Sequence, residues 1–250
     1  MYKIRAVSLK DYRKTGAENT GILVIHGFTS STTESVPIAK IFEEQGYSVS
    51  APLLPGHGTT SKELDQTKWW QWTQKAEKEY EWLKKHNDKI IIGGSSMGGV
   101  ISLYLASKLK IDGVFTLGTP YDLSLKVKIL VTLLNTVKRS LKKPAKTIKY
   151  YEKTGLKSYY EYPPRAMKQL TILFKQMQKN LHKVSAPYSG HFGAKDDLMT
   201  PKDPLIIMSK IKSKKANTIW YKSSGHILIT EPDWEKIKQN LLFFVKTINT

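Results

Sequence analysis

The strongest constraint on the fold of this chain is the pentapeptide Gly-Ser-Ser-Met-Gly at residues 94–98. The isoleucine-rich run before it, residues 89–93, suits a buried parallel strand, and residues 99–107 form an apolar stretch of helical length. A strand that turns at once into a helix needs small residues, because the two backbones nearly touch there. Such a turn strains its central residue and directs that side chain outward. We interpret Ser96 as a candidate nucleophile, with an ordinary glycine-rich turn as the alternative.

Strand and helix signals alternate along most of the chain. This alternation predicts a mostly parallel, doubly wound sheet with helices on both faces. In such sheets, active sites form at the carboxyl ends of the strands. The expected strands are residues 21–26, 47–51, 89–93, 113–118, 188–193 and 218–221, and the expected helices are residues 35–45, 68–86, 99–107 and 231–248.

Residues 121–185 interrupt this alternation, because they are mostly helical in pattern and dense in lysine. We interpret this segment as a helical cap inserted into one domain, whose core is formed by residues 1–120 and 186–250. Its apolar stretch, residues 123–134, either lines an acyl-chain pocket or buries a helical stripe on the sheet edge. The basic residues that follow either lie in solvent or contact an anionic lipid surface. They are Lys138, Arg139, Lys142, Lys143, Lys146 and Lys149.

The net charge of +19 is the unusual feature of the composition. Only four of the 40 basic residues are arginine, and the lysines are spread along the whole chain. Specific phosphate and base contacts favour the planar guanidinium fork of arginine. We therefore expect a solvated, lysine-rich surface and no specific nucleic-acid partner. Weak contact with an anionic membrane surface is the alternative.

Two absences narrow the chemistry and the cellular location. The chain has no cysteine, which excludes disulfides, thiolate metal sites and a cysteine nucleophile. No run approaches the roughly 18 apolar residues of a membrane-spanning helix. Residues 1–10 alternate basic and apolar side chains, unlike a signal peptide. We expect a cytoplasmic protein, either a monomer or a small homo-oligomer.

A serine nucleophile needs a base within hydrogen-bond reach. That base should lie in a loop after a strand, at the same sheet edge as Ser96. His226 fits best, because it follows the strand at residues 218–221 and Gly225 lets its loop approach closely. His26 also lies at a strand end, but it is next to the loop with Phe28. The other histidines are expected to brace a loop, pack in the sheet or lie at the surface: His57, His86, His182 and His191.

The acid that orients the histidine should follow the strand before the last one. The loop at residues 193–201 offers Asp196 and Asp197, and only one of them can point at the histidine. Asp196 is preferred because it is closer to the strand end, while Asp197 stays open as its substitute or as a cap of the turn. The order Ser96, Asp196, His226 then matches nucleophile, acid and base.

An oxyanion hole needs two backbone N–H groups aimed at the developing negative charge. Met97 follows the nucleophile at a helix N-terminus, where N–H groups are free. Phe28 lies in the loop after the first strand and is the expected second donor.

These motifs together resemble the α/β-hydrolase carboxylesterases, in particular small bacterial thermostable-esterase and monoacylglycerol-lipase-type enzymes. The resemblance spans nearly the whole chain outside residues 121–185. It implies Ser96, Asp196 and His226 as the triad, the N–H groups of Phe28 and Met97 as the oxyanion hole, a helical cap over an acyl pocket, and no cofactor. The motifs that carry it are His26-Gly27-Phe28-Thr29, Gly56-His57-Gly58, residues 94–99, Asp196 with Met199-Thr200-Pro201, and Ser224-Gly225-His226.

The chain departs from this family at Ser95, where relatives often carry a larger apolar residue, and in the unusually basic segment 121–185. The expected function is a serine carboxylesterase acting on small to medium acyl esters, including monoacylglycerols. An acyltransferase or thioesterase with the same triad is the second candidate. A non-catalytic binding protein on the same fold is the third, although such a protein would be expected to have lost a triad residue.

Overall fold

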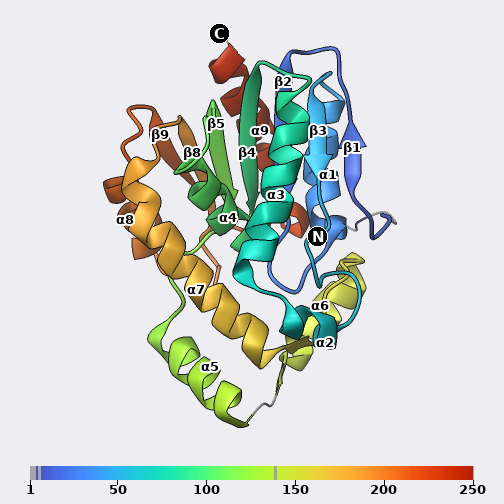
Figure 1. Ribbon diagram of the computed structural model, residues 1–250, viewed down its shortest axis with the longest axis vertical. Helices are drawn as coiled ribbons and strands as arrows, with labels where there is room; N and C mark the ends of the chain where they lie inside the picture. Colours follow the sequence, from blue (N-terminus) through green and yellow to red (C-terminus); the bar gives the residue numbers. More distant parts are fainter. Residues whose placement is uncertain (1–3, 5–6, 138–139, 250) are drawn as a thin grey trace.

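The computed structural model describes residue 4, residues 7–137 and residues 140–249 (Figure 1). Seven strands form one sheet in the order β1-β3-β2-β4-β5-β8-β9, in which β1 is antiparallel to β3 and all other neighbours are parallel. The expected parallel sheet is therefore confirmed. The strands are β1 (Tyr12–Lys14), β2 (Thr20–Ile25), β3 (Ser48–Ala51), β4 (Lys89–Ser95), β5 (Gly113–Leu117), β8 (Tyr188–Gly193) and β9 (Ala216–Tyr221).

Helices cover both faces of this sheet, because successive strand residues point to opposite sides and both sides are apolar. In β4, Ile90 and Ile92 pack with α3, α4 and α7, whereas Ile91 packs with α1 and α9. Figure 1 shows these two layers in front of and behind the sheet. The helices are α1 (Thr32–Glu43), α2 (Ser61–Gln66), α3 (Trp69–Lys84), α4 (Met97–Ala106), α5 (Leu125–Val137), α6 (Ala145–Thr154), α7 (Pro164–Asn180), α8 (Lys202–Lys210) and α9 (Trp234–Asn249).

Some elements differ from the sequence-based expectation. Helix α1 begins at Thr32, earlier than the expected residue 35, because the Ser31 hydroxyl caps it by accepting the Thr33 N–H. Helix α2 and the two-residue strands β6 (Leu141–Lys142) and β7 (Glu161–Tyr162) were not expected, since elements this short contain too few residues for a periodic signal.

The segment at residues 121–185 enters after β5 and returns at β8 (Figure 1). Its last helix, α7, is buried along one side and joins the main core through Ala166, Leu170, Leu173, Phe174 and Met177. Its first helix, α5, instead exposes several large apolar side chains. Lys138 and Arg139, two of the basic residues noted above, lie outside the described residues, as does most of the N-terminal segment 1–6.

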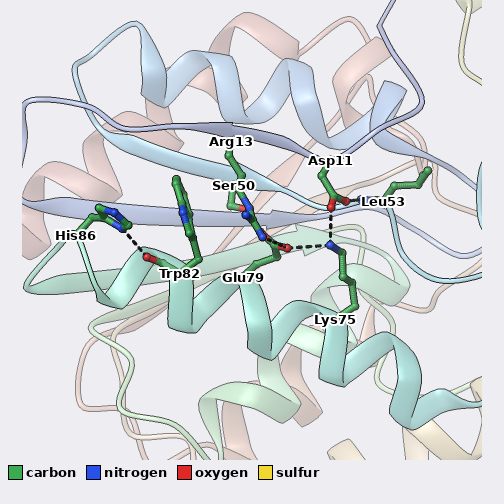
Figure 2. Close-up of polar contacts among 8 residues, drawn as sticks. All are labelled: Asp11, Arg13, Ser50, Leu53, Lys75, Glu79, Trp82 and His86. Carbon is green, nitrogen blue, oxygen red and sulfur yellow. Dashed lines mark hydrogen bonds and ion pairs between the residues drawn. The ribbon is translucent and has the colours of Figure 1, made fainter.

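A buried carboxylate ties the edge strand β1 to helix α3 (Figure 2). Glu79 accepts hydrogen bonds from Arg13 Nε at 2.6 Å, Arg13 Nη2 at 2.8 Å, Lys75 Nζ at 2.9 Å and Ser50 Oγ at 2.8 Å. The Glu79 side chain is fully buried, whereas the Arg13 side chain is 41% exposed. Burial raises the pKa of Glu79, but these hydrogen bonds outweigh burial and lower the pKa to about 2.

The Glu79 network predicts a pH-dependent share of stability. Because the folded pKa is lowered, the stabilisation is present above the ordinary value of 4.5 and is lost as the pH falls towards 2. We expect Glu79→Gln to lower the free energy of unfolding by about 2–3 kcal/mol at neutral pH, with a difference that shrinks below about pH 4.5. Urea unfolding at several pH values measures this. Glu77→Gln, at an exposed position of the same helix, is the control, and a difference that stays constant with pH would contradict the assignment.

Candidate active site

The turn between β4 and α4 is sharp and strained. Ser96 adopts φ 50° and ψ −114°, a conformation that residues other than glycine rarely take. Its N–H donates to the Leu117 carbonyl at 2.8 Å. A Cβ at Gly98 would lie 2.0 Å from the carbonyl oxygen of Ile25, and a Cβ at Gly94 would lie 2.4 Å from the same atom. Only glycine fits at these two positions, so the close crossing of strand and helix depends on them.

Asp196 and His226 form a hydrogen-bonded pair in the loops after β8 and β9. His226 Nδ1 donates to Asp196 Oδ2 at 2.7 Å, and the Asp196 side chain is only 1% exposed. The other carboxylate oxygen of Asp196 accepts the Leu198 N–H at 2.8 Å, while Asp197 is exposed. The structure therefore pairs the histidine with Asp196 and not with Asp197.

The loop after β5 brings this pair to the strained turn. Leu117 binds the N–H of Ser96, and the next residue, Gly118, has φ 56°. A Cβ at Gly118 would lie 2.7 Å from the carbonyl oxygen of His226 and 3.6 Å from Asp196 Oδ2. Ser96, Asp196 and His226 thus lie at one edge of the sheet, at the carboxyl ends of β4, β8 and β9.

The charge of Asp196 favours proton uptake by His226, as a base requires. Burial lowers the pKa of His226, but the hydrogen bond and the charge of Asp196 outweigh burial and raise the pKa above its ordinary value. Since Nδ1 is held by the carboxylate, the remaining ring nitrogen, Nε2, is the atom that can accept a proton. In the described part of the chain it has no hydrogen-bond partner.

The two amides expected in an oxyanion hole are free. Met97 is the first residue of α4, and Phe28 lies in the loop after β2. Among the described residues, neither N–H donates a hydrogen bond to another protein group. A Cβ at Gly27 would lie 3.6 Å from Ser96 Cβ, so the loop that contains Phe28 runs beside the strained turn. The arrangement can therefore direct two N–H groups to an oxygen next to Ser96.

The other histidines have structural surroundings. His26 Nε2 accepts the Leu54 N–H at 3.1 Å, and burial lowers the pKa of His26 to about 4. His57 lies 3.1 Å from the Pro55 carbonyl through Nδ1 and braces that loop, as expected. His191 is buried within the sheet, where burial lowers its pKa to about 3. Two histidines are exposed, also as expected: His86 and His182.

Two charged residues are buried beside the site, and their burial was not predicted from the sequence. Glu34 was not singled out, and Lys143 was grouped with residues expected in solvent or at a lipid surface. That interpretation of Lys143 is wrong, because the residue is 4% exposed and its ammonium lies 2.7 Å from Thr29 Oγ1. Glu34 is 5% exposed and accepts the Gly27 N–H. No local sequence signal marks either residue, since their burial depends on contacts between segments far apart in the chain.

Within the residues that the structure describes, no group of three or more histidine, aspartate or glutamate side chains could hold a metal ion. Nor does any helix of that part of the chain have the length and apolarity needed to cross a membrane.

A protein-family model matches most of the chain. The family model described as Serine aminopeptidase, S33 matches residues 17–233. The chain belongs to this family. The matched range includes the strained turn at Ser96, the loop with Phe28, and both members of the Asp196–His226 pair.

Individual proteins and solved structures whose names are of the lipase or esterase type are also similar to this chain. The chain is 29% identical to the thermostable monoacylglycerol lipase of Bacillus sp. strain H-257 over 240 residues, which are 92% of this chain and 93% of that protein. It is 24% identical to a carboxylesterase of Bacillus subtilis strain 168 over 247 residues, 98% of this chain and 100% of that protein. A solved structure from work on the metagenome-derived lipolytic enzymes LipS and LipT aligns with a TM-score of 0.86 and 24% identity, covering 96% of this chain and 98% of that one. The predicted α/β-hydrolase fold and the resemblance to its esterases and lipases are confirmed.

The pairing of Asp196 with His226 predicts a specific titration. We expect the pKa of His226 to lie above 6.5 in the unsubstituted protein and to fall in Asp196→Asn, because the neutral amide removes the charge while burial remains. Histidine resonances followed by NMR across the pH range measure both values. Asp197→Asn is the matched control, and the same pKa of His226 in both variants would contradict the pairing.

Proposed function

We propose that this protein is a serine carboxylesterase that hydrolyses small to medium acyl esters, monoacylglycerols among them. The observation that carries the proposal is the 2.7 Å bond between His226 Nδ1 and Asp196 Oδ2 beside the strained Ser96. A serine hydroxyl becomes a nucleophile when a neighbouring histidine, oriented by an acid, can take its proton. The names of the bacterial relatives support the choice of carboxylic esters.

In the proposed reaction, Ser96 Oγ attacks the ester carbonyl carbon and His226 Nε2 takes the hydroxyl proton. The resulting oxyanion accepts hydrogen bonds from the N–H groups of Phe28 and Met97. The C–O bond to the alcohol then breaks, and His226 returns the proton to the leaving alkoxide. Water, deprotonated by His226, next attacks the carbonyl carbon of the acyl-enzyme. The bond from that carbon to Ser96 Oγ breaks, His226 returns the proton to Ser96 Oγ, and the carboxylic acid leaves. Asp196 holds the histidine tautomer and stabilises the imidazolium throughout.

We further propose that residues 121–185 act as the cap of this site, inserted into a core of residues 1–120 and 186–250. The start of the segment supports this, because the segment leaves β5 at the same sheet edge as Ser96. Contacts of the segment with the loop after β2 support it as well, since the Tyr159 N–H donates to the Thr29 carbonyl at 3.0 Å. Such a cap would shape the acyl pocket and limit chain length.

Other acceptors and leaving groups define the competing functions. An acyltransferase would pass the acyl group from Ser96 to an alcohol in place of water, and a thioesterase would release a thiol. The family description favours a further candidate, an aminopeptidase that cleaves an amide bond with the same residues. The same nucleophile serves all of these reactions, so substrate comparison must separate them.

Activity measurements on p-nitrophenyl esters of increasing chain length test the proposal, together with labelling by a fluorophosphonate probe. We expect turnover and labelling in the unsubstituted protein, and a loss of kcat of about 10⁴-fold or more in Ser96→Ala, since removing the nucleophile disables the whole triad. Ser95→Ala is the control at the neighbouring hydroxyl. Amino-acid p-nitroanilides, thioesters and added alcohols test the competing functions.

Each outcome of that experiment has a clear meaning. A protein that neither turns over esters nor reacts with the probe would refute the enzyme assignment. Ester turnover that survives Ser96→Ala would refute the nucleophile. Faster cleavage of the p-nitroanilides than of the matching esters would favour the aminopeptidase.

We also propose weak contact of the cap with an anionic membrane surface. Three apolar side chains are spaced four residues apart on α5 and are largely exposed, Leu125 at 72%, Ile129 at 54% and Leu133 at 60%. This spacing places them on one side of the helix. The exposed Lys126 on the same helix, and the high positive charge of the chain, would attract anionic headgroups.

Sedimentation with vesicles of anionic phospholipid tests this contact. We expect binding at low salt that falls as the ionic strength rises, because surface charge attraction is screened over about 10 Å at 0.1 M salt. The triple variant Leu125→Ser, Ile129→Ser, Leu133→Ser should bind less, while ester hydrolysis in solution continues. Vesicles without charge are the control, and no binding to anionic vesicles at low salt would dismiss the contact.

A further inference from the structure

The oxyanion loop, defined here as residues 27–29, is held from both sides by buried charged side chains. On one side the Gly27 N–H donates to Glu34 Oε2 at 2.8 Å. On the other side Lys143 Nζ donates to Thr29 Oγ1 at 2.7 Å. Phe28, whose N–H is the proposed oxyanion donor, lies between these two contacts. Glu34 and Lys143 are 5% and 4% exposed, so neither charge is solvated as a surface charge would be.

Thr29 is the strained residue of this loop. Its φ of 61° lies in the left-handed region, which costs a residue with a Cβ about 1–2 kcal/mol. Neighbouring groups hold it there: its carbonyl accepts from the Tyr159 N–H at 3.0 Å and from Ser158 Oγ at 3.0 Å, and its hydroxyl donates to the Phe28 carbonyl at 2.6 Å. The conformation of the loop therefore depends on contacts with residues 143–159, which are distant in sequence.

Lys143 occupies a polar and aromatic cage. Its ammonium donates to Ser158 Oγ at 2.8 Å and lies over the rings of Tyr151 at 4.7 Å and Tyr162 at 4.9 Å. The Tyr162 ring also stacks on Phe28, with 6.5 Å between centroids and 3° between the ring planes. Among the described residues no carboxylate lies within ion-pair distance of this ammonium. Hydroxyl groups and ring faces thus compensate for its burial.

We propose that Lys143 and Glu34 are positioning residues that keep the Phe28 N–H aimed at the carbonyl oxygen of a bound ester. The inference rests on the proposed function of the site. Neither side chain touches the reacting atoms, and each acts through the loop residue that it binds. When either contact is lost, the strained loop can relax and the N–H moves away from the oxyanion. Because the oxyanion exists only after attack, kcat falls more than KM rises.

The cage also predicts a pH dependence on the alkaline side. Burial lowers the pKa of Lys143 to about 7, and the charge of Glu34 opposes this shift. As the pH rises through about 7, the ammonium loses its charge and its charge-assisted bonds weaken. We therefore expect kcat to decline above neutral pH. The titratable groups around Lys143 are Glu34, Tyr151 and Tyr162, and burial raises the pKa of each. Two further charged groups face these neighbours, His226 towards Glu34 and Asp197 towards Tyr162.

Kinetics on p-nitrophenyl butyrate across the pH range test the proposal. Lys143→Met keeps the length of the side chain and removes the charge and both hydrogen bonds. We expect its kcat to fall about 10–100-fold, less than the loss of an oxyanion donor itself, with KM changed less than about twofold and no alkaline decline. Lys142→Met, at the exposed neighbouring position, is the matched control. Glu34→Ala should also lower kcat, and Glu34→Gln should restore part of it because the amide oxygen can still accept the Gly27 N–H.

Hydrogen exchange of the amides at residues 27–31, followed by mass spectrometry, gives a readout that does not need activity. We expect faster exchange in Lys143→Met than in Lys142→Met. If Lys143→Met does not fold, Ser158→Ala removes one partner of the ammonium and one bond to Thr29, and it should show the same changes at smaller size. Kinetics and exchange equal to those of Lys142→Met would overturn the positioning role. A protein without ester turnover would refute the proposed function, while the exchange data would still decide whether the loop is held.

Discussion

The whole site depends on one backbone contact, the approach of α4 to the end of β2. The carbonyl oxygen of Ile25 lies so close to Gly94 and Gly98 that a Cβ at either position would come within 2.4 Å of it. This contact sets the strained conformation of Ser96 and also the direction in which the chain leaves β2. The loop with Phe28 starts from there, so the positions of Ser96 and of the Phe28 N–H depend on the same crossing. A methyl group at residue 98 would displace both together.

The buried charges contrast with the basic surface. Most lysines of this protein lie in solvent, where each contributes little to the fold. Three of the buried charged groups each bind an edge strand or a loop: Glu79 binds Arg13 of β1, Glu34 binds Gly27, and Lys143 binds Thr29. Net charge therefore says little about the architecture, whereas the partners of these few groups determine local geometry.

Sequence reasoning worked best where the physical signal is local. The strand expected at residues 113–118 is observed at Gly113–Leu117, and the turn at Ser96 was located, because apolar runs flanked by glycine depend only on their own residues. The pairing of His226 with Asp196 was anticipated from strand order, since parallel strands end at one edge. The same reasoning failed for Lys143, whose burial comes from Tyr151, Tyr162 and Ser158. It also missed α2, β6 and β7, which are too short to show a period.

The dependence of Thr29 on residues 143–159 has a consequence for how such proteins diversify. If residues 121–185 only covered a pocket, this segment could be exchanged between related proteins without changing the rest of the site. Here the Thr29 carbonyl and hydroxyl are bound by Tyr159, Ser158 and Lys143, so the loop at residues 27–29 depends on residues 143–159 for its conformation. A chimera carrying a foreign insertion would keep Ser96 and the Asp196–His226 pair but lose the support of the loop. Changes in the insertion and in the sequence after β2 should therefore be inherited as linked pairs.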